Sequence, residues 1–131
     1  MISQLTIKNF GLFENISINF NKNLNIFTGE TGAGKSIIID AVNYALGQKL
    51  NTNQIRNKNI PCFVEVIFEL SKTQIQEIPI LEDYITENNI FIITRTFLQN
   101  GQNKNKINDF TITLTQLKKN RNLFSRLSWA T

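Results

Sequence analysis

The stretch TGETGAGKS, residues 28–36, decides the predicted fold. Its spacing satisfies the pattern G-x-x-x-x-G-K-[ST], a loop whose backbone N–H groups turn inward on a phosphate. Successive amides converge on one anion only where some residues adopt φ > 0 or approach the ligand so closely that a Cβ would collide. Gly32 and Gly34 meet that need. The stretch therefore predicts a phosphate-binding loop.

We expect this loop to hold phosphate groups together with Mg²⁺. Lys35 would reach the β- and γ-phosphates as a point charge, and Ser36 would offer its hydroxyl to Mg²⁺. A helix that begins near Gly34 adds unpaired N–H groups and the positive end of its dipole, and both favour a polyanion. The predicted cofactor-binding residues are Gly29, Glu30, Thr31, Gly32, Ala33, Gly34, Lys35 and Ser36, with Ser36 as the metal ligand.

The sequence around the loop fits a buried strand before it and a helix after it, as this motif requires. Leu24, Ile26 and Phe27 form a short apolar run that predicts the strand. Gly47 stands where a helix C-terminal cap belongs. A Gly-rich turn without a ligand is the alternative, and this setting disfavours it. The apolar stripe of the predicted helix consists of Ile38, Ala41, Val42, Ala45 and Leu46.

Length and composition narrow the classes of function. The chain has 131 residues, enough for one domain, and 41% of them are hydrophobic, which is typical of a globular protein. No run is long enough to cross a bilayer and residues 1–4 do not resemble a signal peptide, so we expect a cytoplasmic location. Histidine is absent, which excludes imidazole catalysis within the chain. Cys62 is the single cysteine, and we expect a small buried apolar residue there.

Hydrophobic alternation predicts that strands dominate on both sides of the loop helix. Ser71 is a candidate cap of a short helix that Pro79 would interrupt, and Thr113 or Thr115 would cap a final helix. Asn100-Gly101 is a strong hairpin signal. Consecutive strands do not suit the alternating strands and helices of a compact phosphate-loop kinase. The predicted strands lie in residues 2–7, 16–20, 62–70, 90–98 and 104–114.

Two segments, LTIKNFGLFENISINF and TGETGAGKSIIIDAVNYALG, closely resemble the amino terminus of the RecN family of SMC-like bacterial DNA repair ATPases. A second match lies further along, where the family shows an arginine, a G-R-S-[KR] turn and an I-N-G. This chain has Arg95 and then GQNK and IND, so it departs from the family at Gln102, Asn103 and Asp109. The resemblance covers residues 1–119.

The resemblance implies an α/β phosphate-loop NTPase fold, specifically the amino-terminal β-rich lobe of an ABC/SMC-type head. It also implies ATP binding, a part in recombinational repair of DNA double-strand breaks, and DNA and a paired second head as partners. Arg56 stands where SMC-like heads carry an arginine near the nucleotide phosphates, although a solvated loop arginine is the simpler interpretation. Arg95 is expected to be structural, at a strand edge. Lys104 and Lys106 are candidates for DNA phosphate contacts, but a solvated hairpin is favoured. Asp40 has no spacing that predicts a metal ligand.

The motifs that an ABC-type ATPase needs for hydrolysis are absent from the chain: a Q-loop, an LSGG signature and a Walker B acidic pair. We therefore expect an incomplete head that does not turn over ATP alone. In the family the last helix leads to H-G-Q-H, whereas this chain ends RNLFSRLSWAT. Reading the gene one base later from about Asn120 permits D-Y-H-G-Q, so residues 120–131 are predicted to be an out-of-frame or unselected tail. Without Arg121 and Arg126, twelve basic residues remain against ten acidic ones, so the net charge falls from +4 to +2 and says little about DNA.

Two alternatives stay open. The first is a stand-alone phosphate-loop nucleotide-binding or regulatory module, which predicts a tail that folds onto the body. The second is a compact phosphate-loop kinase or GTPase, which would need an acidic catalytic residue after an apolar strand. The segment FVEVIFEL offers that alternative only Glu65 and Glu69, on an expected solvent face.

Overall fold

The computed structural model describes residues 1–20, 32–84 and 88–128, with the side chains of residues 32–34 left out. The predicted strand at residues 24–27 and the first part of the phosphate loop therefore lie outside the described residues. No described helix is long and apolar enough to cross a membrane. The strands are β1 Ile2–Phe10, β2 Phe13–Asn19, β3 Cys62–Glu69, β4 Ile90–Phe97, β5 Asn103–Ile107 and β6 Phe110–Thr111; the helices are α1 Gly32–Ala45, α2 Lys72–Gln76, α3 Leu114–Lys119 and α4 Arg121–Ser128.

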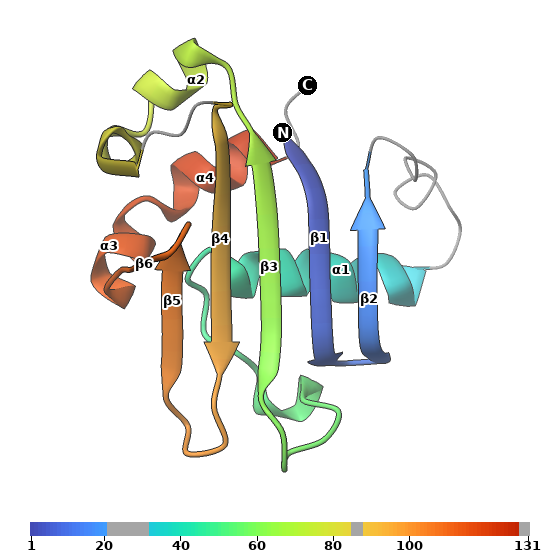
Figure 1. Ribbon diagram of the computed structural model, residues 1–131. Coiled ribbons are helices and arrows are strands. Elements are labelled where there is room, and N and C mark those ends of the chain that lie inside the picture. Colours follow the sequence, from blue (N-terminus) through green and yellow to red (C-terminus); the bar gives the residue numbers. More distant parts are fainter. Residues whose placement is uncertain (21–31, 85–87, 129–131) are drawn as a thin grey trace.

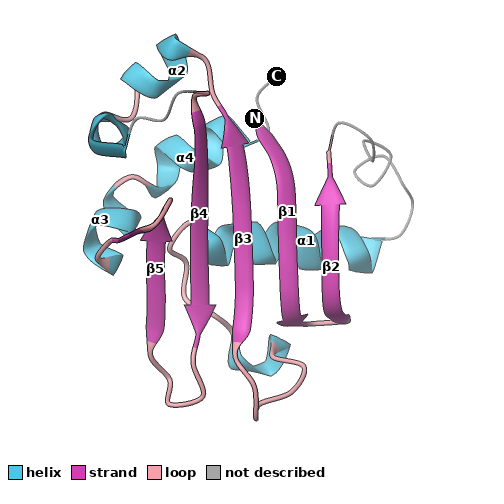
Figure 2. Ribbon diagram, in the orientation of Figure 1, coloured by secondary structure: helices cyan, strands magenta, loops and turns pink. Residues whose placement is uncertain are grey.

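The described strands form one antiparallel sheet in the order β2-β1-β3-β4-β5-β6. Figure 1 shows this sheet face on, with α1 crossing behind the strands from the β2 side to the β4 and β5 side. Figure 2 separates the strands from the helices and shows α1 and α4 passing behind the strands. The consecutive antiparallel strands confirm the predicted β-rich lobe. They also differ from the parallel sheet that a compact kinase or GTPase would require.

The core lies between the sheet and α1, because both elements present an apolar face. On β3 the side chains of Val64, Val66 and Phe68 are fully buried, as alternation predicts. The predicted apolar stripe of α1 is confirmed, since every member is 3% exposed or less. These buried members are Ile38, Ala41, Val42, Ala45 and Leu46.

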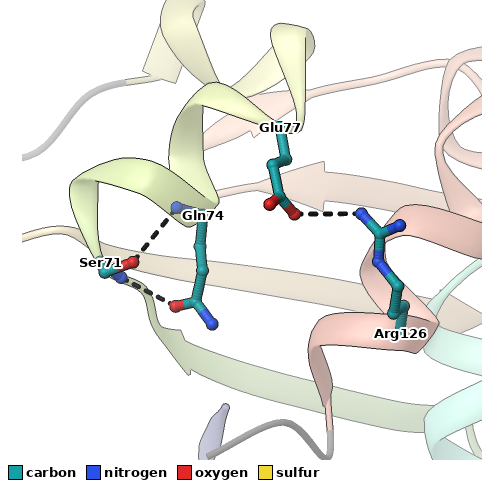
Figure 3. Close-up of polar contacts among 4 residues, drawn as sticks. All are labelled: Ser71, Gln74, Glu77 and Arg126. Atoms are coloured by element: carbon teal, nitrogen blue, oxygen red, sulfur yellow. Dashed lines mark hydrogen bonds and ion pairs between the residues drawn. The ribbon is translucent and has the colours of Figure 1, made fainter.

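The helix ends follow the local signals in the sequence. Gly47 follows α1 with φ of +111°, a backbone conformation that favours glycine. Ser71 caps α2 through a reciprocal capping box with Gln74, drawn in Figure 3. Thr113 caps α3 in the same way. A 3-10 helix begins at Pro79, past the end of α2, as proline there requires.

Residues 121–128 form α4, whose apolar side chains pack under the sheet. Phe124 is 1% exposed, and its ring centroid lies 5.8 Å from that of Phe68. Leu127 is also buried. Arg126 pairs with Glu77 at 3.0 Å and links α4 to the end of α2 (Figure 3). This packing is what the stand-alone alternative predicts, while the proposed loss of reading frame near residue 120 stays a prediction for the nucleotide sequence to test.

Candidate nucleotide site

The described part of the predicted site is the first turn of α1. The helix backbone begins at Gly32, and the side chains of Lys35 and Ser36 are exposed to solvent. Residues 29–31 lie outside the described residues. In the described chain no group of three or more His, Cys, Asp or Glu side chains is placed to hold a metal ion. The expected role of the Ser36 hydroxyl as a Mg²⁺ ligand stays a prediction.

The hairpin turn between β1 and β2 packs closely against this part of α1. Gly11 has φ of +58°, and a Cβ added there would lie 3.1 Å from Cγ2 of Ile37. The backbone N–H of Gly11 donates to the carbonyl oxygen of Gln54. Gln54 in turn donates from Nε2 to Oδ2 of Asp40 at 2.8 Å. The hairpin turn and the loop at residues 51–61 are thus joined beside the amino-terminal half of α1.

Asn9 fixes the same loop to the sheet. It is 3% exposed with φ of +59°, a left-handed conformation that asparagine tolerates better than most residues. Its Nδ2 lies within hydrogen-bond distance of the carbonyl oxygens of Asn57, Ile60 and Pro61, at 2.8, 3.0 and 3.2 Å. Its Oδ1 accepts from the backbone N–H of Asn57 at 2.7 Å. One side chain therefore satisfies backbone groups across five residues of loop.

Arg56 lies in the loop that Asn9 holds. Its side chain is exposed, and its backbone N–H donates to the carbonyl oxygen of Asn9 at 3.4 Å. The exposure fits the simpler interpretation of a solvated arginine, and contact with nucleotide phosphates stays a prediction. Asp40 accepts the hydrogen bond from Gln54 Nε2 at 2.8 Å.

The prediction that Arg95 lies at a strand edge is wrong. Arg95 is on β4, which pairs with β3 on one side and β5 on the other, and the residue is 2% exposed. Its Nε donates to Oδ1 of Asn105 at 2.9 Å, and its Nη1 donates to the carbonyl oxygens of Tyr44 and Gln48 at 2.8 and 2.7 Å. The guanidinium also lies 4.4 Å from the Tyr44 ring centroid. Arg95 therefore binds the last turn of α1, which carries the negative end of the helix dipole.

Burial changes the titration of the groups around Arg95. Burial lowers the pKa of the Arg95 guanidinium and raises the pKa of the Tyr44 hydroxyl, because both charged forms lose solvation. Cys62 is fully buried as predicted, and burial raises the pKa of its thiol to about 12. Lys104 and Lys106 are exposed on β5, as expected for a solvated hairpin.

Comparison with known proteins agrees with this architecture. A family model described as an AAA domain matches residues 4–128. The chain belongs to that family. It is also RecN-like: the "DNA repair protein RecN" of Rickettsia typhi is 33% identical over 127 residues, which cover 97% of this chain and 23% of that protein. The protein of the same name from Vibrio cholerae is 30% identical and covers 90% of the chain.

The fold of this RecN-like chain is that of SMC ATPase heads. A structure described as "Structural biochemistry of ATP-driven dimerization and DNA stimulated activation of SMC ATPases" has a TM-score of 0.68 at 21% sequence identity. The likeness covers 98% of this chain and 80% of that one, so a solved chain only slightly longer has this fold. By contrast, the chain spans about a fifth of the length of the RecN relatives, 23% and 21% of the two named above.

Sequence reasoning missed the tertiary contacts of Asn9 and Tyr44. Asn9 carried a usable signal, because an asparagine just before Phe10-Gly11 at the end of a strand suits a left-handed turn. Tyr44 stands beside the apolar stripe of α1, and its hydroxyl donates to Oδ1 of Asn103 at 2.7 Å. No local pattern indicates that contact, because the two residues are 59 positions apart.

Proposed function

We propose that this chain binds Mg-ATP through residues 29–36, as the ATP-binding amino-terminal part of a RecN-like DNA repair protein. One observation carries the proposal. Lys35 and Ser36, the two side-chain ligands of the motif, are exposed on the first turn of a helix whose opposite face is buried. The buried Ile38 and Ala41 fix that helix to the sheet, so the lysine and hydroxyl are presented from a rigid element.

Calorimetric titration of the purified chain with Mg-ATP tests the proposal. We expect saturable binding that Lys35→Ala weakens by at least about tenfold, since the lysine supplies a charge-assisted contact to the phosphates. Lys72→Ala is the matched control, because Lys72 is an exposed lysine on α2 outside the motif. Equal affinity in the Lys35 and Lys72 variants, with both folded by circular dichroism, would refute the proposal.

We further propose that the chain does not hydrolyse ATP on its own. A water-orienting residue and the acidic pair that binds the metal are needed for turnover, and the corresponding motifs are absent from the printed sequence. The measurement is steady-state phosphate release with Mg-ATP in excess. Sustained turnover that disappears in Lys35→Ala would contradict this part of the proposal.

The proposal has four further parts, which follow from the resemblance to the RecN family. They are a role in double-strand break repair, DNA binding, pairing with a second head and a cytoplasmic location. Lys104 and Lys106 are exposed on one strand and are the residues of this chain available for DNA phosphates at the hairpin. Duplex binding that falls with rising salt and weakens in the double variant Lys104→Ala, Lys106→Ala would support that role. Binding that is unchanged in the double variant would remove it.

A stand-alone nucleotide-binding or regulatory module is the second candidate, and the packing of α4 favours it. Phe124 and Leu127 are buried against the body, as this candidate requires of the last residues. It predicts tight Mg-ATP binding by a monomer without a partner. Titration measures the affinity for Mg-ATP, and light scattering measures the mass of the species that binds it. Tight binding by a monomer would favour the stand-alone module, because the head of a larger ATPase is expected to need the rest of its site for tight binding.

A further inference from the structure

A cavity lined in part by cationic side chains lies at the carboxyl-terminal end of α1, away from the nucleotide loop. It has a volume of about 360 Å³ and lies between the residues that follow α1, the β4–β5 hairpin and α3. Five of its described lining residues are polar or cationic, namely Lys49, Thr52, Arg95, Asn103 and Lys118, and none of the described lining residues is acidic. Phe97 and Leu114 contribute apolar wall. The described lining therefore combines three cationic residues with a mainly apolar wall, and it contains no carboxylate.

Arg95 forms the buried base of this cavity. Its Nε and Nη1 are occupied by Asn105, Tyr44 and Gln48, but Nη2 has no acceptor among the described residues. Within the described chain no fully buried side-chain nitrogen or oxygen lacks a partner. The Nη2 group is consequently not fully enclosed, and Arg95 is one of the residues that line the cavity. Two N–H donors of a charged, 98% buried residue are left to meet a ligand.

Asn103 presents a second set of donors. The Tyr44 hydroxyl donates to Oδ1 of Asn103 at 2.7 Å, which occupies the oxygen end of the amide. The Nδ2 end of the amide is then the part available to a ligand. Lys49 and Lys118 are exposed, and neither is in an ion pair with a described residue. Among the described residues, the groups that Arg95 contacts near the end of α1 are the carbonyl oxygens of Tyr44 and Gln48. These oxygens carry only partial negative charge.

From this lining we propose that the cavity binds the phosphate group of a small phosphate monoester. A doubly charged oxyanion matches cationic donors in a cavity whose described lining has no acidic residue, and Arg and Lys are the side chains that bind phosphate most strongly. The volume is in the range of small-ligand sites and exceeds what inorganic phosphate needs, so the ester group occupies the space beside Phe97 and Leu114.

This cavity is separate from the nucleotide loop. Residues 37–45 of α1 separate the end of the loop from the end of the helix, a length of roughly 14 Å at 1.5 Å per residue. Figure 1 shows the first end of α1 near β2 and its last end at β4, further along the sheet. A ligand in the cavity would be a different molecule from a nucleotide bound at residues 29–36. The inference therefore does not depend on the proposed function.

The test uses the Lys35→Ala chain labelled with ¹⁵N, so that the nucleotide loop does not compete for the probe. Phenyl phosphate is titrated in, with inorganic phosphate and benzoate as parallel probes. We expect saturable shifts of the Gly47, Gly101 and Lys118 amides, tighter for phenyl phosphate than for either parallel probe. Absence of saturable shifts, or equal affinity for benzoate, would overturn the proposal.

Charge reversal of the exposed lysines supplies variants that keep the fold, since Arg95 itself is in the core. Lys49→Glu and Lys118→Glu are each expected to weaken phenyl phosphate about tenfold. Lys119→Glu is the matched control, because Lys119 is the exposed neighbour on α3 that does not line the cavity. Equal weakening by Lys119→Glu would show diffuse charge attraction instead of a site. Shifts of the same amides by a DNA duplex, with none by the monoester, would also refute the proposal.

Discussion

Replacing Asn9 by alanine tests how the loop beside α1 is held. The side chain accepts one hydrogen bond and contacts three carbonyl oxygens through Nδ2. At a net value of about 1 kcal/mol per bond, and with two donor hydrogens for three carbonyls, their loss costs roughly 2–3 kcal/mol. Alanine also replaces asparagine at φ of +59°, which adds about 1 kcal/mol. We therefore expect Asn9→Ala to lose about 3–4 kcal/mol, a large part of the free energy of unfolding of one domain.

Urea denaturation followed by circular dichroism measures this loss, and hydrogen exchange of the Asn57 amide measures whether the loop opens first. Asn9→Gly removes the same bonds without the strain at positive φ, so we expect it to be about 1 kcal/mol more stable than Asn9→Ala. Asn15→Ala is the control, because Asn15 is exposed on β2. Neutral surface substitutions change the free energy of unfolding by about 0.5 kcal/mol or less. A difference between Asn9→Ala and the parent chain within this range would refute the reasoning.

Three further predictions concern the rest of the fold. Phe124→Ala, which removes a side chain 1% exposed, should cost about 3–5 kcal/mol in urea denaturation; a loss below about 1 kcal/mol would favour the tail interpretation of residues 120–131. Gly47→Ala should lower stability by about 1–2 kcal/mol, because φ is +111° and the new Cβ meets Cγ of Leu117 at 3.3 Å; unchanged stability would contradict the capping geometry. Cys62 should resist thiol labelling at pH 8 until the chain unfolds. Since its folded pKa is raised to about 12 from 9.0, the contribution of Cys62 to stability should be constant below about pH 9 and be lost as pH rises towards 12, so the fall in stability over this range should be smaller in Cys62→Ala.

Local sequence signals predicted the helices and their ends well. The apolar stripe of α1, the cap at Gly47 and the capping residues Ser71 and Thr113 each depend on neighbours within about four residues. Such signals are decided before tertiary packing, and the structure confirms all of them. The antiparallel β-rich lobe was also predictable, because the strands follow one another without helices long enough to cross over between parallel partners.

Strand order was not available from the sequence, and that explains the error at Arg95. Its neighbours on β4 read as an ordinary alternating strand, so only the pairing of β5 on the far side shows that the position is central. The partners of its guanidinium, Tyr44 and Gln48, are 51 and 47 residues away. The Asn9 contacts were missed for the same reason, since they join residues about 50 positions apart.

The most direct measurement of the central claim is a titration of the ¹⁵N-labelled chain with Mg-ATP, followed at each backbone amide. If residues 29–36 hold the triphosphate, the largest saturable shifts should fall on the amides of Gly34, Lys35 and Ser36 and should vanish in Lys35→Ala. Saturable binding by the folded chain that leaves these amides unmoved would contradict the claim.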